Sequence, residues 1–330
     1  MQEFDPKLDQ AARIAWMYHV EGAKQDEIAR QVGLSRQGVQ RALALARGEG
    51  LIKIRLDHPV AECMELAQAL RARFGIEYCE VAAAMPGGEP LRPIAVTAAA
   101  MLESYLGHKD RLTIGIGTGR AMRAMVDELS RIACPQHRLV SRVGVISPDG
   151  ATNPFDALTW LADKTGARSY QLPAPIMADS RDDREHVEAQ RLYSLVAALA
   201  AEADVSFIGI GTMDEQAPMR LEGSITLDDV RRLRGRGAVG ELTSWILDRD
   251  GNIVDDEVND RVTAVPIVRH PGRPVIGVAG GPAKLDAIAA ALRGQWLSGL
   301  VTDEHVARAL LRRESKDRDS EDRETMRGEG

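Results

Sequence analysis

The chain has 330 residues, 44% of them hydrophobic, and carries a formal net charge of −7. This length allows two or three domains, or one large domain with an appendage, and the hydrophobic content supports a sizeable core. The acidic balance excludes a protein that coats nucleic acid along its whole length, so any contact with DNA must be confined to a basic patch.

Cysteine usage and the apolar runs set the compartment that we expect. Cys63, Cys79 and Cys134 are odd in number, far apart and without CxxC spacing, which indicates reduced thiols and neither a disulfide framework nor a zinc site. The first residues, MQEFDPKLDQ, are too acidic and polar for a signal peptide, and no apolar run approaches the length of a membrane span. We therefore expect a cytoplasmic protein with no membrane partner.

Three helices are expected at the start of the chain. Residues 6–20 have a broad apolar side, and residues 25–32 have apolar positions at helical spacing. Gly33 supplies a sharp turn, and Ser35 is a good N-cap for a further helix that runs to about Arg47. This pattern predicts a helix-turn-helix.

The outward side of the third helix has residue types that donate hydrogen bonds to base edges and phosphates. The candidate DNA-binding residues are Ser35, Arg36, Gln37, Gln40 and Arg41. Residues 35–55 hold five basic side chains against one acidic one, a local balance of +4 in an acidic chain. The alternation in LIKIRL, residues 51–56, is typical of a strand, which would serve as a small wing beside the helix. An ordinary helical hairpin with a solvated polar face is the competing interpretation.

The remainder of the chain alternates between apolar runs and amphipathic helices. A helix from about Val60 to Phe74 is a linker, a dimer contact or a plain domain helix. Beyond it, the alternation predicts a mainly parallel α/β sheet that is covered on both faces. The expected strands lie at 76–84, 111–116, 139–146, 169–175, 205–211, 274–281 and 299–303, and the expected helices at 93–107, 120–132, 154–166, 183–202, 283–293 and 303–312. Residues 313–330 are almost entirely polar and charged, and we expect a disordered tail.

Glycines mark the expected ends of two strands. TIGIGTGRAM places Gly115, Gly117 and Gly119 between a strand and a helix, where free N–H groups of the helix can meet an anion. The spacing is not the dinucleotide fingerprint, and a tight structural turn explains it equally well. Gly209 and Gly211, in GIGTMDE, end a second strand in the same way.

A third strand end carries a lysine in addition to glycines. In VIGVAGGPAK, Gly280 and Gly281 precede Lys284 in the first turn of a helix. A lysine there opposes the helix dipole, which suggests a negative group nearby unless the side chain simply points into water. Since open α/β sheets bind ligands at the carboxyl ends of their strands, these turns together indicate a ligand site.

The segment GELTSWILDRDGNIVDDEVNDRV, residues 240–262, supplies further polar candidates. Glu241, Asn259 and Arg261 would hydrogen-bond to hydroxyls or to a phosphate, and a hairpin turn is expected at Asp250-Gly251. The acids at 255–257 are spaced for a solvated loop and not for a metal site. Without a Ser-His-Asp or Cys-His grouping, we expect no catalytic residues, no metal and no cofactor.

These residues resemble the SorC/DeoR-like sugar-binding transcriptional regulators of bacteria over nearly the whole chain, from about residue 10 to 312. The resemblance is carried by QDEIARQVGLSRQGVQRALALARGEGLI, GIGTGRAM, DRDGNIVDDEVNDRV, GVAGGPAKLDAIAAALRGQWLSGLVTD and VARALL. It implies an operator-binding domain at residues 1–58 and an effector-binding and oligomerisation domain at 59–312. The second domain would be Rossmann-like, similar in fold to sugar-phosphate isomerases, and usually assembled in a tetramer.

The resemblance also implies which residues contact the effector, which in this family is a sugar, a polyol or, often, a phosphate of one. The effector site falls on Gly117, Thr118, Gly119, Arg120, Glu241, Asn259, Arg261, Gly280, Gly281 and Lys284. Two positions depart from the usual pattern: Ala121 stands where many members have threonine, and Glu241 where aspartate is usual. Both departures leave open whether the effector is phosphorylated.

The function expected is therefore a non-enzymatic DNA-binding regulator of a carbohydrate or polyol catabolic operon, in a homodimer or homotetramer. The alternatives are an enzyme of sugar-phosphate isomerase type and a scaffold whose first domain makes protein contacts. The N-terminal unit separates them, because an isomerase has no need of Arg36, Gln37, Gln40 and Arg41 on a capped helix.

Overall fold

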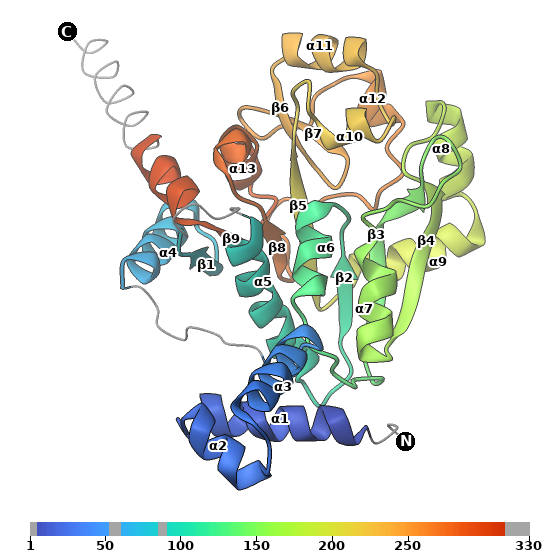
Figure 1. Cartoon of the computed structure of the whole chain (residues 1–330). Coiled ribbons are helices and arrows are strands. Elements are labelled where there is room, and N and C mark those ends of the chain that lie inside the picture. The colour runs from blue at the N-terminus through green and yellow to red at the C-terminus, as the bar shows by residue number, and fades with distance from the viewer. Residues whose placement is uncertain (1–4, 53–60, 85–90, 314–330) are drawn as a thin grey trace, which may run out of the picture. The chain divides into compact units, whose positions relative to one another are not determined.

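The computed structural model describes residues 5–52, 61–84 and 91–313. The chain divides into two compact units, Met1–Pro59 and Val60–Gly330. The described helices of the first unit and the mixed sheet of the second can be followed in Figure 1. Within the described ranges, no helix combines the length and the apolarity that a membrane crossing requires.

The first unit is a three-helix bundle in the described residues, as the sequence predicts. Its helices are α1 (Pro6–His19), α2 (Gln25–Val32) and α3 (Arg36–Gly48). The core they share includes the fully buried side chains of Ile14, Ile28 and Val39, one from each helix. An amphipathic face on every helix is thus used to build one small core.

The turn between α2 and α3 follows the predicted chemistry. Gly33 ends α2 with a φ of 70°, a backbone conformation that glycine adopts at little cost. The Ser35 hydroxyl accepts a 3.1 Å hydrogen bond from the Gly38 N–H and so caps α3. Of the predicted wing, Leu51 and Ile52 are not in a strand, and Ile52 packs against the helical core. Residues 53–58 lie outside the described residues.

The second unit is built on a parallel sheet, which confirms the predicted fold class. The strands are β1 (Tyr78–Ala82), β2 (Thr113–Ile116), β3 (Arg138–Ile146), β4 (Arg168–Pro175), β5 (Val205–Thr212), β8 (Val275–Val278) and β9 (Gly299–Asp303). Their order is β1-β9-β8-β5-β2-β3-β4, and every pairing in this path is parallel. From β2 the sheet continues through β3 and β4 on one side, and from β5 through β8 and β9 on the other. The direction of strand order therefore reverses between β2 and β5, the two central strands.

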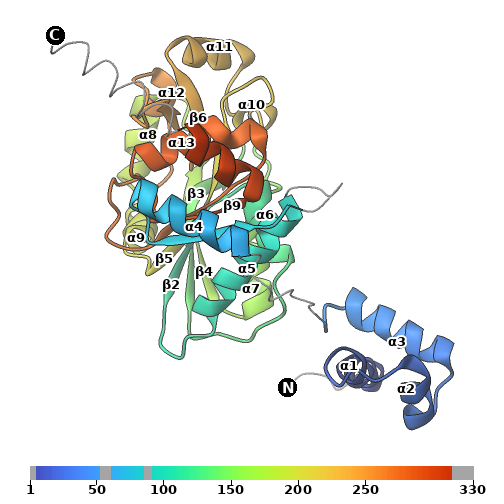
Figure 2. The ribbon, with the colours of Figure 1, turned by 90° about the vertical axis from the view of Figure 1, so that its left-hand side faces the viewer.

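Helices cover both faces of this sheet. One face packs against α5 (Leu91–Leu106), α6 (Arg120–Asp127) and α7 (Ala157–Thr165). The other packs against α4 (Ala61–Phe74), α9 (Arg191–Ala201) and α13 (Leu285–Arg293). Figure 2, in which the left-hand side of Figure 1 faces the viewer, shows α4 in front of the sheet. Because both faces are covered, the strands are apolar on both sides: Phe207 of β5 joins the first core and Ile208 the second.

A smaller structure, which we call the cap (residues 213–262), stands beyond the carboxyl end of β5 (Figure 1). It contains β6 (Ala238–Leu242) and β7 (Trp245–Asp248), an antiparallel hairpin that pairs with the end of β5. Three helices complete it: α10 (Pro218–Leu221), α11 (Leu227–Gly235) and α12 (Glu257–Asp260). An apolar core that includes Met219, Val230 and Ile246 joins the cap to Val143 of β3 and to Ile176 after β4.

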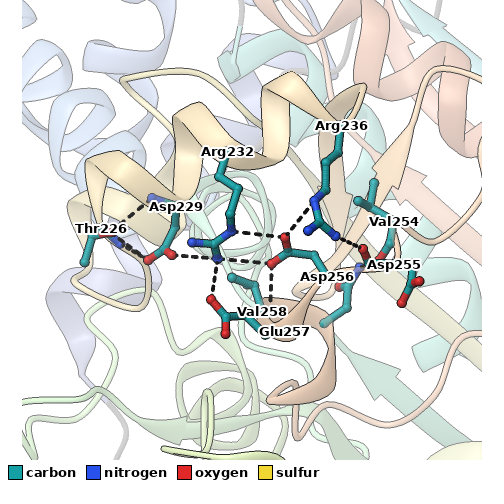
Figure 3. Close-up of polar contacts among 10 residues, drawn as sticks. Thr226, Asp229, Arg232, Arg236, Val254, Asp255, Asp256, Glu257 and Val258 are labelled. Atoms are coloured by element: carbon teal, nitrogen blue, oxygen red, sulfur yellow. Dashed lines mark hydrogen bonds and ion pairs between the residues drawn. The ribbon is translucent and has the colours of Figure 1, made fainter.

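An ion-pair network joins α11 to the segment before α12 (Figure 3). Arg232 donates to both oxygens of Asp256 at 3.1 Å and lies 2.8 Å from Asp229 and 3.0 Å from Glu257. Burial alone would raise the pKa of Asp256, but Arg232, the Val258 N–H and Arg236 bring the pKa below its ordinary value. The solvated loop predicted at 255–257 is therefore wrong at its centre, because the Asp256 side chain is 1% exposed.

Two further expectations about secondary structure need correction. The single helix predicted at 183–202 is two helices, α8 (Arg181–Glu188) and α9, separated by an extended Gln190. The break lets α9 bury Tyr193 and Ala200 while α8 buries no residue. The first turn of the predicted helix at 283–293 is a 3-10 helix, η1 (Pro282–Lys284), before α13.

Gly144 of β3 tests how closely the outer strands pack. A Cβ added there would lie 2.1 Å from the Pro175 carbonyl oxygen and 2.5 Å from that of Ala174, both backbone atoms of β4. We expect Gly144→Ala to lower the free energy of unfolding by about 1 to 3 kcal/mol, because backbone cannot move aside as a side chain does. The matched control is Gly235→Ala in α11, where a Cβ meets nothing within 4 Å and helix propensity favours alanine by about 0.5 to 1 kcal/mol. Equal urea midpoints for the two variants would contradict this packing.

Candidate functional site

A pocket opens at the carboxyl ends of the central strands, at the point where the strand order reverses. It is lined by Thr118, Gly119, Arg120, Ala121, Ile176, Gly209, Ile210, Gly211, Pro218, Met219, Glu222, Ser224, Glu241, Thr243, Ser244 and Lys284. The sheet supplies one side of the pocket and the cap the other. Its position is the one where open α/β sheets bind ligands.

Five of the predicted effector residues meet in this pocket. Thr118, Gly119 and Arg120 come from the turn between β2 and α6, Glu241 from β6 and Lys284 from η1. Gly119 is the N-cap of α6, so the free N–H groups of that helix end face the same region. The ends of β2 and β8, at Ile116 and Val278, are far apart in sequence and yet contribute to one site, as the sequence arguments expect.

Glu241 reaches the pocket because of a turn that the sequence did not reveal. Thr243 and Ser244 join β6 to β7 with φ values of 49° and 72°, which is left-handed backbone without glycine. The Ser244 N–H donates a 2.6 Å hydrogen bond to the Glu241 carboxylate. Glu241 pairs with Gly211 of β5, and a Cβ on Gly211 would lie 2.0 Å from Oε1 of Glu241. Glycine at 211 therefore leaves the room that this carboxylate occupies.

Glu241 and Lys284 both line the pocket and influence each other electrostatically. Burial raises the pKa of Glu241, against the opposing effects of the Ser244 N–H and the Lys284 ammonium group. Burial lowers the pKa of Lys284, although Glu241 opposes this and Arg120 adds to it. The Lys284 ammonium also donates to the carbonyl of Ile210, at the end of β5. Lysine in the first turn of a helix is thus compensated by a carboxylate and a carbonyl of the protein itself.

Two pocket residues in the cap, Glu222 and Ser224, were missed by the sequence arguments. Burial and the neighbouring Glu241 raise the pKa of Glu222 to about 7, and Arg120 opposes this. The Ser224 hydroxyl is buried and has no hydrogen-bond partner among the residues that the structure describes. MRLEGS, residues 219–224, carries no periodic or motif signal that would have singled out either side chain.

The other predicted effector residues do not line the pocket. Asn259 is buried and holds the cap together: its side chain bonds to the N–H and carbonyl of Ile246 and to the Val254 carbonyl. Arg261 donates to the Ala178 carbonyl at 2.9 Å. The predicted turn at Asp250-Gly251 is present, but Asn259 bonds within the cap and Arg261 to the segment after β4, and neither residue lines the pocket.

The remaining glycines among the predicted effector residues serve the backbone. Gly117 donates to the Phe207 carbonyl at 2.8 Å, within the contact of β2 with β5. Gly280 leaves space for Asp303, whose carboxylate accepts a 2.7 Å hydrogen bond from the Gly281 N–H. These positions shape the strand ends and are not among the residues that line the pocket.

The candidate DNA-binding side chains lie together on the first unit. Arg36, Gln37, Gln40 and Arg41 are all exposed, whereas Val39 and Leu43 of the same helix are buried. Two of the four have weak partners on α2: Arg36 lies 3.8 Å from Asp26, and Gln40 donates to Gln25 at 3.3 Å. Exposed contacts of this kind contribute little, so these side chains are free to exchange them for other partners.

The described residues carry no sign of metal or thiol chemistry. No group of three or more metal-ligating side chains is found among them. Burial raises the pKa of Cys63, Cys79 and Cys134, which disfavours the reactive thiolate.

Comparison with known proteins gives one consistent result. A family model described as a sugar-binding domain matches residues 58–312. The chain is 33% identical over 312 residues to the erythritol catabolism regulatory protein EryD of Brucella abortus, covering 94% of this chain and 98% of that protein. It is 31% identical over 313 residues to the transcriptional regulator LsrR of Escherichia coli, covering 92% and 95%.

Solved structures give the same result for the fold. The full-length sorbitol operon regulator SorC from Klebsiella pneumoniae superposes with a TM-score of 0.67 at 25% identity, covering 93% of this chain and all of that one. A DeoR family transcriptional regulator from Listeria monocytogenes gives a TM-score of 0.65 at 23% identity, over 75% of this chain and 99% of that one.

The raised pKa of Glu222 has a consequence for stability. The folded chain holds this proton up to about pH 7, whereas the unfolded chain loses it near the ordinary value of 4.5. Unfolding thus releases a proton between these values, and the contribution of Glu222 to stability falls as the pH rises through this window. Glu222→Gln should therefore stabilise the chain at pH 8, by about 1 kcal/mol after allowance for solvent screening, and have little effect at pH 5.

Melting temperatures of the full chain at both pH values measure this difference. The control is Glu215→Gln, an exposed glutamate a few residues earlier in the cap, which should give the same difference from the wild type at either pH. A Glu222→Gln effect that is independent of pH would rule out a protonated Glu222.

Proposed function

The chain belongs to the family of transcriptional regulators that carry this sugar-binding domain, and we propose that it binds operator DNA through α3 and a small carbohydrate, polyol or sugar phosphate in the pocket. Like its relatives, it is a carbohydrate-responsive regulator and not an enzyme. The observation that carries the proposal is the pocket at the reversal of strand order, in a chain that also has an exposed, capped basic helix.

The case for DNA contact rests on the surface of α3. Its first two turns present Arg36, Gln37, Gln40 and Arg41 to solvent, and recognition helices place base-reading residues there. Arginine and glutamine form bidentate hydrogen bonds with guanine and adenine edges. The chain as a whole is acidic, so this local surface and not the net charge would attract DNA. A protein that contacts an operator would act in the cytoplasm.

The case for effector control rests on the two-sided construction of the pocket. Arg120 and Lys284 come from the sheet side, and Glu222, Ser224 and Glu241 from the cap. A ligand that contacts both sides can bind one arrangement of cap and sheet more tightly than another. It then increases the population of the arrangement that it binds more tightly. Such a preference can alter operator affinity by about 1 to 3 kcal/mol, the usual range of allosteric coupling.

We also propose that the chain acts as a homodimer or homotetramer. A single helix-turn-helix makes few base contacts, and paired domains that read a pseudo-palindrome are the usual solution. Exposed apolar side chains support a contact between copies: Leu192 and Leu195 lie on α9, 64% and 53% exposed, and Met64 lies on α4, 57% exposed. Light scattering of the full chain at micromolar concentration measures the mass, and a monomer that retains full operator affinity would refute the assembly.

Replacement of Gln40 or Arg41 by alanine tests the DNA contact. An operator sequence can be selected from a random duplex library with the full chain and then used in fluorescence anisotropy. Each replacement should weaken operator binding by about 1 to 3 kcal/mol, because one base-edge contact is lost. Gln10→Ala is the control, since Gln10 is an exposed glutamine on α1. Equal operator affinities for Gln40→Ala, Arg41→Ala and Gln10→Ala would refute the assignment of α3.

Replacement of Arg120 by alanine tests the effector site. Operator affinity is measured with and without a panel of three- to six-carbon polyols and their monophosphates at 10 mM or less. The ligand that alters operator binding of the wild type should need about 10-fold higher concentrations with Arg120→Ala, because a charge-assisted hydrogen bond is lost. Arg123→Ala is the control, since Arg123 on the same helix pairs with Asp127 and Trp160 instead. A full response in Arg120→Ala would place the effector elsewhere.

A further inference from the structure

The pocket carries charges of both signs. Arg120 and Lys284 contribute two positive charges, and Glu222 and Glu241 contribute two carboxylates. One of the cations is already engaged, because Lys284 lies beside Glu241 and donates to the Ile210 carbonyl. A phosphate dianion entering this pocket would meet an environment with little excess positive charge.

Two polar groups of the pocket lack hydrogen-bond partners within the described part of the chain. The Ser224 hydroxyl is 4% exposed and has none. The Glu222 carboxylate feels the charges of Glu241 and Arg120, and no hydrogen bond to it is found among these residues. Both groups stand on one short segment, on either side of Gly223. Buried polar groups are normally paired, so this segment is prepared for a ligand.

The hydrogen-bonding roles of these groups select the chemistry of the ligand. A carboxylate only accepts hydrogen bonds, whereas a hydroxyl both donates and accepts. At pH 8, above the pKa of Glu222, phosphate oxygens, which also only accept, cannot pair with the Glu222 carboxylate and would be repelled by its charge. An alcohol hydroxyl can donate to Glu222 and accept from Ser224 or Arg120. The cavity volume, about 60 Å³, is well below the range of roughly 300 to 1,000 Å³ typical of drug-sized ligands, which favours a short molecule.

We propose that the ligand of this pocket is a short, uncharged polyol and that Glu222 and Ser224 are its specificity-determining residues. A hydroxyl of the ligand donates to the Glu222 carboxylate, and a neighbouring one pairs with the Ser224 hydroxyl. Glu222 also discriminates against phosphate esters of the same compound. This inference rests on the proposed function, since it takes the pocket as the effector site.

Isothermal titration calorimetry of the full chain at pH 8, where Glu222 is ionised, tests the ligand class. The probes are glycerol, erythritol, ribitol, xylitol and sorbitol, and the monophosphate of each. At least one neutral polyol should bind the wild type, and its monophosphate should bind at least about 10-fold more weakly. Tighter binding of the monophosphate, or no binding by any of the neutral polyols, would overturn the proposal.

Two variants separate recognition from folding. Glu222→Gln keeps the shape of the side chain and removes its charge. It should therefore weaken polyol binding by about 10-fold and reduce the preference for the polyol over its monophosphate. Ser224→Ala should weaken polyol binding about 10-fold and leave the melting temperature of the free protein unchanged or higher, because no hydrogen bond of the free protein is lost. Glu215→Gln, on the exposed surface of the cap, should match the wild type. An unchanged preference in Glu222→Gln together with unchanged polyol affinity in Ser224→Ala would also overturn it.

Operator binding measured with the same probes distinguishes the two proposals. If a monophosphate binds more tightly and alters operator affinity, the regulatory function stands and the ligand class proposed here is wrong. If a neutral polyol binds with the expected dependence on Glu222 and Ser224 but leaves operator affinity unchanged, the ligand class is upheld and the regulatory role of the pocket fails.

Discussion

Parallel pairing makes the strands of the sheet end at one edge, and the rest of the second unit is arranged around that constraint. The reversal of order between β2 and β5 sends the following connections to opposite sides, which leaves the edge between them open. The turns after β2, β5 and β8 therefore reach the same pocket although they are far apart in sequence. Neither a cofactor nor a catalytic grouping is needed to explain this convergence, since the topology alone produces it.

The cap completes the pocket because its own polar interactions fix the β6–β7 hairpin. The Asn259 side chain hydrogen-bonds to backbone groups of Ile246 and Val254, and Arg232 hydrogen-bonds to the Asp256 carboxylate. These contacts position Glu241 opposite Gly211, beside Lys284. Side chains that look like ligand contacts in the sequence are thus used as internal supports, and the carboxylate that they position is the one that faces the pocket.

Local patterns explain how much of this could be predicted. The alternation of apolar runs and helices, the Ser35 cap and the glycine-rich strand ends depend on residues that are near each other in sequence, and they were predicted correctly. Glu222 and Ser224 were missed because their significance depends on burial beside Glu241, which is distant in sequence. The Thr243-Ser244 turn lacks the glycine or asparagine that usually marks left-handed backbone. Asp256 looked solvated because its arginine partners lie on another helix.

The segment Glu222-Gly223-Ser224 has a bearing on how such regulators diversify. It follows α10 and hydrogen-bonds locally, with the Ser224 N–H donating to the Met219 carbonyl and the Gly223 N–H to that of Arg220. It contributes no strand to the parallel sheet and no backbone bond to the ladders that support Arg120 and Lys284. Exchange of two side chains on this segment can therefore change the preferred ligand while the scaffold and its DNA-binding unit stay intact. A regulator can in this way acquire a new effector through single substitutions, each of which leaves the protein folded.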